Sequence, residues 1–183
     1  MKQDIIELTK ADEDMEGFQF LIRAMVPENY TNKNFCSDFC IKIRDNEAIT
    51  TDGKRCHIYN PSETYESGVY RVLKRLKAHV VLLKEVETDY KKMFPDFVPS
   101  FKKSDNPDCE FEGVFDAFDA GIAQAMTKII RELPGFQTVN PAYLKDLDDA
   151  FICHISKMNT YILFHGTRKK ASITTMEYED ILI

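Results

Sequence analysis

The stretch "ITTDGKRCHIY", residues 49–59, determines how the first half of this chain is interpreted. Its Asp52-Gly53 pair separates two short segments in which apolar and polar residues alternate. Asp-Gly supplies the positive φ that a tight turn requires, so the stretch predicts a β-hairpin. Lys54 and Arg55 follow the turn directly, and two cations at a hairpin tip also suit an exposed binding edge. The stretch alone leaves both interpretations open.

Length and composition indicate a globular protein of one large or two small domains. The chain has 183 residues, and 44% of them are hydrophobic, which is enough apolar material for a packed core. No run is long and apolar enough to span a bilayer, and the acidic start "MKQDIIELTKADED" lacks the apolar stretch of a signal peptide. The five cysteines are an odd number, which fits reduced thiols better than a disulfide framework. We therefore expect a cytoplasmic protein with no membrane partner.

The charge balance argues against a protein that binds the phosphates of nucleic acid through a high net positive charge. The net charge is −6. Residues 1–100 hold 15 Lys and Arg against 17 Asp and Glu, and residues 101–183 hold 9 against 13, so both halves are acidic, at −2 and −4. Nucleic-acid-binding domains are usually basic. Any contact with nucleic acid here requires a local basic face on an acidic body.

The first half predicts a helix followed by strands. Residues 17–26 place apolar side chains at helical spacing, and Pro27 ends that pattern. Residues 39–43, 48–51 and 54–59 predict three strands, with Asp45-Asn46 as the first turn. Residues 68–78 are ambiguous, because their apolar residues recur with helical spacing although several of them suit a strand. The spacing favours a helix there, and residues 79–87 then predict a buried strand.

The second half predicts helices first and strands last. Residues 94–109 carry three prolines and predict a linker. Residues 115–133 predict a helix that Pro134-Gly135 ends, and Asn140-Pro141 marks the start of a short helix over residues 140–147. Three strands are expected at residues 150–156, 160–166 and 170–176. This order predicts an α+β fold, antiparallel sheets with helices packed on one face, in two domains over residues 1–100 and 108–183.

Four segments in this order resemble the bacterial DNA sliding clamps, the β subunit of DNA polymerase III. Thr51, Asp52, Gly53 and Arg55 match the clamp segment "ATDGHRLA", with Lys54 and Cys56 in place of its His and Leu. Downstream, "MFPDFVPSF" resembles "FPDYRRVLP", "TVNPAYLKDL" resembles the start of a clamp helix, and "KASITTM" resembles the last clamp strand. The chain has two domains where the bacterial clamp has three. Its second domain is expected to be trimmed, and "EYEDILI" replaces the clamp's C-terminal motif.

The resemblance implies a DNA-clamp-like fold and a processivity factor, or a partner-binding scaffold derived from one, in DNA replication. Such a protein is not an enzyme, needs no cofactor, and encircles duplex DNA while tethering replication proteins by a short peptide motif. The implied peptide pocket is Thr51, Gly53, Lys54, Arg55, Cys56, Pro99 and Met176. Clamp helices line the DNA, and the basic residues on our predicted helices are Arg23, Arg71, Lys74, Arg75, Lys128, Arg131 and Lys145. Two-domain subunits would need three copies for a six-domain ring, so a homotrimer is one expectation. If the trimmed second domain prevents the ring from closing, a monomeric or dimeric adaptor is the other. A phage or prophage origin is a separate expectation.

Other chemistry has weaker support in the sequence. Cys36, Cys40, Cys56-His57 and Cys153-His154 include no CxxC pair, so we expect no metal site. No common catalytic motif occurs, and Asp116 and Asp119, three apart on the expected helix, suit its N-terminus. His165 has no evident catalytic partner, so we expect no catalytic residues. The alternative is a small soluble enzyme or regulatory protein without a recognisable motif.

Overall fold

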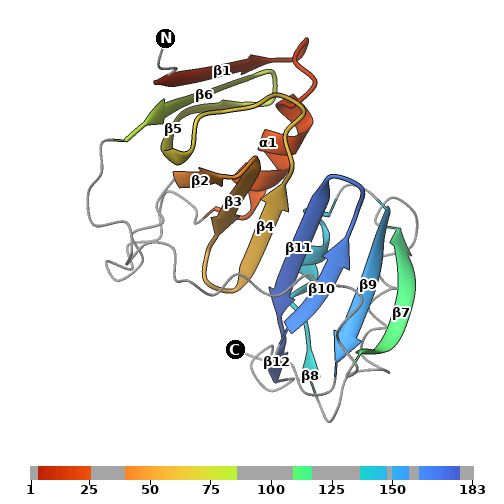
Figure 1. Ribbon diagram of the computed structural model, residues 1–183. Coiled ribbons are helices and arrows are strands. Elements are labelled where there is room, and N and C mark those ends of the chain that lie inside the picture. The colour runs from red at the N-terminus through yellow and green to blue at the C-terminus, as the bar shows by residue number, and fades with distance from the viewer. Residues whose placement is uncertain are drawn as a thin grey trace. The chain divides into compact units, whose positions relative to one another are not determined.

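The chain forms two compact units, Met1–Val98 and Pro99–Ile183, in a computed structural model (Figure 1). The structure describes residues 4–25, 40–85, 109–116, 137–147, 150–156 and 161–177. No helix within these ranges combines the length and the apolarity that crossing a bilayer requires.

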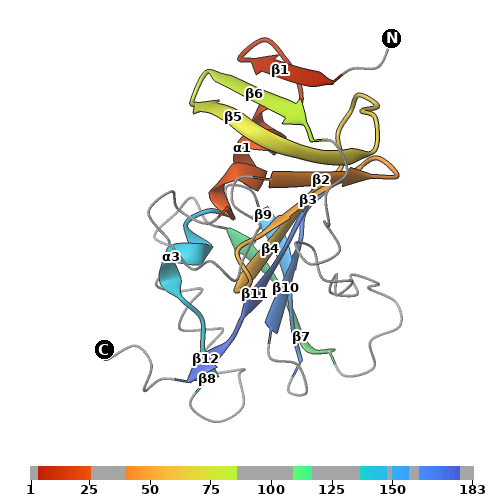
Figure 2. The ribbon, with the colours of Figure 1, turned by 90° about the vertical axis from the view of Figure 1, so that its left-hand side faces the viewer.

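The first unit is an antiparallel sheet with one described helix packed on it. Its elements are β1 (Ile5–Thr9), α1 (Met15–Arg23), β2 (Cys40–Arg44), β3 (Glu47–Thr51), β4 (Arg55–Tyr59), β5 (Gly68–Leu76) and β6 (His79–Lys84). The strand order is β1-β6-β5-β2-β3-β4, and each neighbouring pair is antiparallel. Figure 2 shows α1 against one face of this sheet. Phe18 and Leu21 of α1 are fully buried there with Ile41, Tyr70 and Leu82 of the strands.

Both predicted turns of the first unit are confirmed by positive φ angles. Asp45 and Asn46 have φ of 50° and 61°, as a two-residue hairpin turn between β2 and β3 requires. Gly53 has φ of 84°, in the left-handed region that favours glycine. The helix expected at residues 17–26 is present but shifted, since α1 begins at Met15 and ends at Arg23, before Pro27.

The helix expected at residues 68–78 is wrong, because this segment is strand β5. It pairs with β2 on one side and with β6 on the other, and Tyr70 on it is fully buried. A β-bulge shifts the register between Val72 and Lys74 and interrupts the alternation of the strand. The interrupted alternation placed apolar residues at 69, 72, 73 and 76, which imitates the spacing of a helix face. Two rows of backbone hydrogen bonds outweigh that pattern.

One buried carboxylate joins α1 to the segment that follows β4. Asp14, the N-cap residue of α1, accepts hydrogen bonds from the Tyr59 hydroxyl (2.7 Å), the Ser62 amide and hydroxyl (2.7 and 2.8 Å), the Glu63 amide (3.1 Å) and the Tyr65 hydroxyl (3.1 Å). One turn on, a Cβ at Gly17 would overlap the ring of Tyr59, so the helix packs on β4 through bare backbone. These contacts fix α1 against the strand that leads out of the 49–59 hairpin.

The second unit has its own antiparallel sheet and a short helix. Its elements are β7 (Cys109–Asp116), β8 (Gln137–Thr138), α3 (Pro141–Leu144), β9 (Ala150–Ser156), β10 (Tyr161–His165), β11 (Lys169–Thr174) and β12 (Met176–Glu177). The order is β11-β10-β9-β7, and β8 pairs with β12. The predicted start of α3 is confirmed, because Pro141 is its first residue and the Asn140 side chain accepts a hydrogen bond from the Ala142 amide at 2.9 Å.

Two expectations for the second half need correction. Cys109 belongs to β7 and not to a linker, and Phe115 and Asp116 belong to β7 and not to a helix. Strands β1, β7 and β8 were missed, and the rest of the expected linker and helix, 94–108 and 117–133, lies outside the described residues.

Candidate partner-binding hairpin

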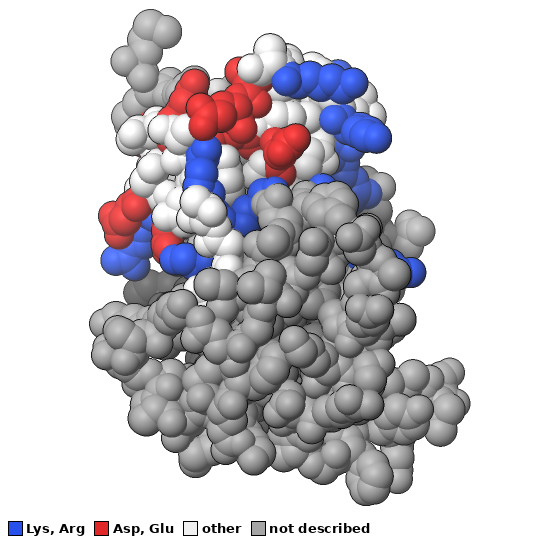
Figure 3. All heavy atoms as spheres, turned by 90° about the vertical axis from the view of Figure 1, so that its right-hand side faces the viewer, with Lys and Arg blue, Asp and Glu red and all other residues white. Residues whose placement is uncertain are grey.

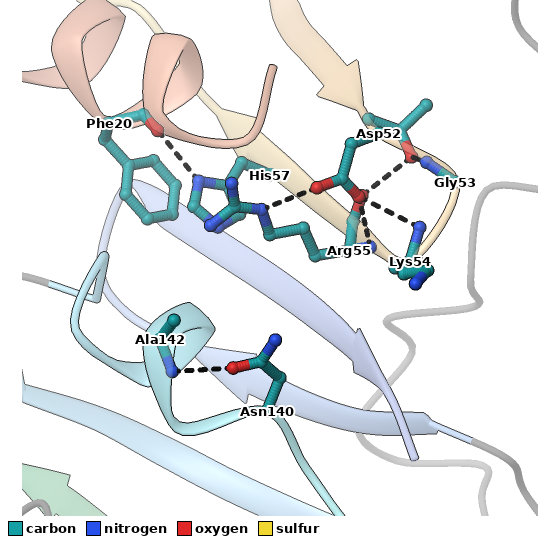
Figure 4. A network of polar contacts seen from close by, with 9 residues as sticks. Phe20, Asp52, Gly53, Lys54, Arg55, His57, Asn140 and Ala142 are labelled. Carbon is teal, nitrogen blue, oxygen red and sulfur yellow. Dashed lines mark hydrogen bonds and ion pairs between the residues drawn. The ribbon is translucent and has the colours of Figure 1, made fainter. Parts of the chain in front are cut away.

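The loop between β3 and β4 is organised by the carboxylate of Asp52. Its Oδ1 accepts hydrogen bonds from the amides of Lys54 and Arg55, both at 2.9 Å (Figure 4). The Thr51 hydroxyl donates to the Arg55 carbonyl at 2.7 Å and accepts from the Gly53 amide at 3.0 Å. Side chains thus satisfy the backbone groups that the turn leaves without ladder partners. The result is a defined hairpin tip.

The guanidinium of Arg55 forms an ion pair within this loop. Its Nε lies 3.0 Å from Oδ2 of Asp52, and the two side chains are only 9% and 11% exposed. An ion pair so shielded from water orients both groups more strongly than a surface pair does. Asp52 was not among the predicted site residues, although an Asp immediately before a turn glycine is the signal for such a side chain–backbone cap.

Beyond the loop, β4 continues with two buried side chains that point to opposite faces of the sheet. Cys56 is buried, and burial, with smaller contributions from the charges of Asp52 and Glu47, raises the pKa of its thiol to about 12. The next residue, His57, is fully buried, stacks on Phe20 at 4.1 Å between ring centroids, and places Nδ1 2.8 Å from the Phe20 carbonyl (Figure 4). A carbonyl accepts only, so Nδ1 carries the proton. The hairpin is held to α1 on this side.

The predicted pocket residues differ in their accessibility. Gly53 and Lys54 are exposed at the tip, Thr51 and Arg55 are half-buried, and Cys56 is buried. Pro99 lies outside the described residues. Met176 is in β12 of the second unit, where its backbone pairs with Thr138. Within the first unit, therefore, Gly53 and Lys54 are the pocket residues most available to a partner.

Three of the predicted DNA-facing residues lie on a strand and not on a helix. Arg71, Lys74 and Arg75 belong to β5, which corrects the premise on which they were chosen. Arg71 pairs with Glu85 at 2.6 Å, and Lys74 lies 2.8 Å from Nδ1 of His79. Figure 3 shows Lys and Arg gathered at one edge of the described surface, beside a group of acidic side chains.

The other predicted DNA-facing residues are divided between helix ends and residues that are not described. Arg23 is the last residue of α1, and Lys145 is the exposed C-cap residue of α3. Lys128 and Arg131 lie outside the described residues.

Within the described ranges, no three His, Cys, Asp or Glu side chains gather as a metal site would require.

Comparison with known proteins identifies this arrangement at the level of fold. The DNA polymerase III β subunit of Thermotoga maritima matches with a TM-score of 0.54 at 8% identity, over 98% of this chain and 67% of that one. A putative β subunit from Eubacterium rectale matches with a TM-score of 0.52 at 10% identity, over 98% and 67%. The fold is that of a bacterial sliding clamp.

The clamp fold covers nearly the whole chain, which spans about two thirds of the length of these clamps. A third match is the Helicobacter pylori β clamp bound to a DNA ligase peptide, with a TM-score of 0.49 at 10% identity over 94% of this chain and 65% of that one. No protein-family model matches the sequence, and no curated protein matches it. The α+β, clamp-like fold expected from the sequence is confirmed.

Proposed function

We propose that this protein is a sliding-clamp-like processivity factor, or a partner-binding scaffold derived from one, in DNA replication. The observation that carries the proposal is the clamp fold over nearly the whole chain. Clamps perform no bond chemistry, so the protein is not an enzyme in this proposal and works by tethering. The absence of a common catalytic motif from the sequence agrees with this role.

The acidic composition is compatible with a clamp. A ring that encircles duplex DNA holds it by topology, so strong neutralisation of phosphates is unnecessary. A few cations facing the hole suffice, and an acidic exterior keeps DNA from binding outside. Because clamp helices face the DNA, the proposed lining now rests on Arg23, Lys128, Arg131 and Lys145. The cations of β5 are no longer part of it.

The proposed partner site is the peptide pocket at the 51–56 hairpin, completed by Pro99 and Met176. In this proposal Gly53 allows close approach of a peptide backbone and Lys54 provides a basic rim. In this proposal the partly buried Thr51 and Arg55 form a side of the pocket, and the buried Cys56 packs behind them.

Isothermal titration with a clamp-binding peptide from a replicative polymerase tests the pocket. We expect a Kd on the order of 1 μM, because an extended peptide loses conformational freedom on binding. Salt should weaken binding only modestly, since most of the attraction is apolar burial and Lys54 adds one exposed charge at the rim. The variant Lys54→Glu should weaken binding, whereas Arg44→Glu, the same charge change on an exposed residue at the end of β2, should not. Absence of heat at high micromolar concentration, or equal weakening by both variants, would reject the pocket.

The proposed assembly is a homotrimer, because three two-domain subunits supply six domains. Mass measurement in solution tests this directly. A trimer supports a ring around duplex DNA, and a monomer at all concentrations leaves only the scaffold form of the proposal.

A further inference from the structure

The exposed large hydrophobic residues of the described structure lie on the two strands that flank β6. Ile5 on β1 is 53% exposed, and Leu73 and Leu76 on β5 are 56% and 55% exposed. Single exposed leucines are ordinary, but three such residues on two strands separated only by β6 form a group. A group of exposed apolar side chains on one part of a sheet is typical of an interaction surface.

Strand register places most of this group on the outer face of the sheet. Ile6, Leu8, Val80 and Leu82 point to the core, so the residues between them point outward. Across β1, β6 and β5 the outward rows are Ile5–Leu83–Arg71, Glu7–Val81–Lys74 and Thr9–His79–Leu76. The bulge adds Leu73 beside them. We call this surface the outer patch. It is apolar along its middle, whereas the solvent face of an antiparallel sheet is normally polar.

Cations surround the outer patch. Residues 67–84 contain five Lys and Arg and no Asp or Glu, in a chain whose net charge is −6. The acids beside the patch are engaged, because Glu7 lies 2.6 Å from Nε2 of His79 and Glu85 lies 2.6 Å from Nε of Arg71. Three cations, Arg71, Lys74 and Lys77, outnumber these two acids, so their sum is +1. Arg75 is not counted, because it pairs with Val80 in the row that points to the core.

We infer that the outer patch is a second docking surface, which binds an acidic protein segment carrying aliphatic side chains. The apolar middle would receive leucine-like side chains, and Lys74 and Lys77 would meet carboxylates at the rim. Charge complementarity selects an acidic partner, and the exposed leucines select a protein and not duplex DNA, whose phosphate backbone offers them no apolar surface. The surface shares no residue with the 51–56 hairpin, so the inference is independent of the proposed peptide pocket.

Fluorescence anisotropy with a labelled peptide of sequence DLEELLE tests the inference on the full chain. We expect saturable binding that weakens as salt increases, because part of the attraction is between exposed charges. Lys77→Glu should raise the Kd about fivefold or more, since it replaces attraction by repulsion at the rim. Leu73→Ser with Leu76→Ser should raise it by a similar factor through lost apolar contact.

Matched controls separate docking from general effects. Arg44→Glu carries the same charge change at the end of β2, next to the start of β5, because Ile43 pairs with Gly68. It should leave the Kd unchanged, because Leu73, Leu76 and Lys77 lie at the opposite end of β5. All changed side chains are exposed, and circular dichroism should show the parent fold in each variant. Absence of binding, or equal weakening by Lys77→Glu and Arg44→Glu, would overturn the inference. Tighter binding of labelled duplex DNA than of the peptide, lost on Lys77→Glu, would also overturn it and make this a nucleic-acid surface.

Discussion

Replacing Asp14 with alanine should destabilise the first unit, because one buried carboxylate holds α1 to the segment after β4. Asp14 is 1% exposed and accepts five hydrogen bonds. Ser62 and Glu63 are exposed, so water can replace the carboxylate at their groups. The hydroxyls of Tyr59 and Tyr65 are in buried residues, and losing an acceptor there costs about 1–3 kcal/mol each. We expect a loss of about 2–5 kcal/mol.

The charge of Asp14 adds a pH dependence with a definite sign. Burial raises the pKa, but hydrogen bonds from Ser62, Tyr59 and Glu63 outweigh it and lower the pKa from 3.8 to about 2. The folded-state pKa lies below the unfolded one, so the stabilisation is fully present above about pH 4 and is lost as pH falls towards about 2. This difference is worth roughly 2 kcal/mol, reduced by solvent at Ser62 and Glu63. Asp14→Asn should therefore lose stability at neutral pH and show less acid destabilisation.

Urea unfolding followed by tyrosine near-ultraviolet circular dichroism measures both effects. The parent, Asp14→Asn and Asp14→Ala are compared at neutral pH and between about pH 4 and 2. Glu16→Gln is the control, an exposed acid in the first turn of the same helix, and should change stability by only a few tenths of a kcal/mol. Hydrogen bonds from Thr9 also lower the pKa of Asp12. Asp12 is therefore left unchanged in all variants. A free energy of unfolding for Asp14→Ala within about 0.5 kcal/mol of the parent would refute the reasoning.

Three further predictions concern single positions. Gly17→Ala should lower the free energy of unfolding by about 1–3 kcal/mol, because the new methyl overlaps the buried ring of Tyr59; an unchanged urea midpoint would contradict that packing. Gly53→Val should cost about 1–2 kcal/mol, because φ is 84° and a β-branched residue is strained there, and a thermal melt matching the parent would count against the turn. The Cys56 thiol, with its pKa raised to about 12, should react with a thiol reagent only after unfolding; rapid labelling of Cys56 in the native protein, located by mass spectrometry, would disprove its burial.

The sequence predicted those elements whose signals are local. Asp45-Asn46, Gly53 and the Asn140-Pro141 start of α3 each require a particular backbone angle or cap that neighbouring residues specify. The helix expected at 68–78 failed because pairing with two other strands decides that segment. The bulge there also gave the strand a helical spacing.

The contacts of Asp14 were beyond sequence reasoning for a related reason. Its partners lie 45 to 51 residues away, and nothing near Asp14 in the chain distinguishes it from the neighbouring acids. The outer patch was hidden in the same way, because Ile5 and Leu76 are brought to one face only by the order of the strands.

Within the 51–56 stretch, the residues that match the clamp segment differ in their role from Lys54, which does not match it. The matching residues Thr51, Asp52, Gly53 and Arg55 all build the loop, through hydrogen bonds, an ion pair or a positive φ. Because these side chains bond to the backbone and to one another within the loop, they hold its shape before any partner binds. Lys54 contributes only its amide to that network, and its side chain stays exposed. Under the proposed function, the loop residues fix the shape of the hairpin and position 54 sets the chemistry offered to a partner. A basic side chain there favours peptides with an acidic residue beside their apolar anchor.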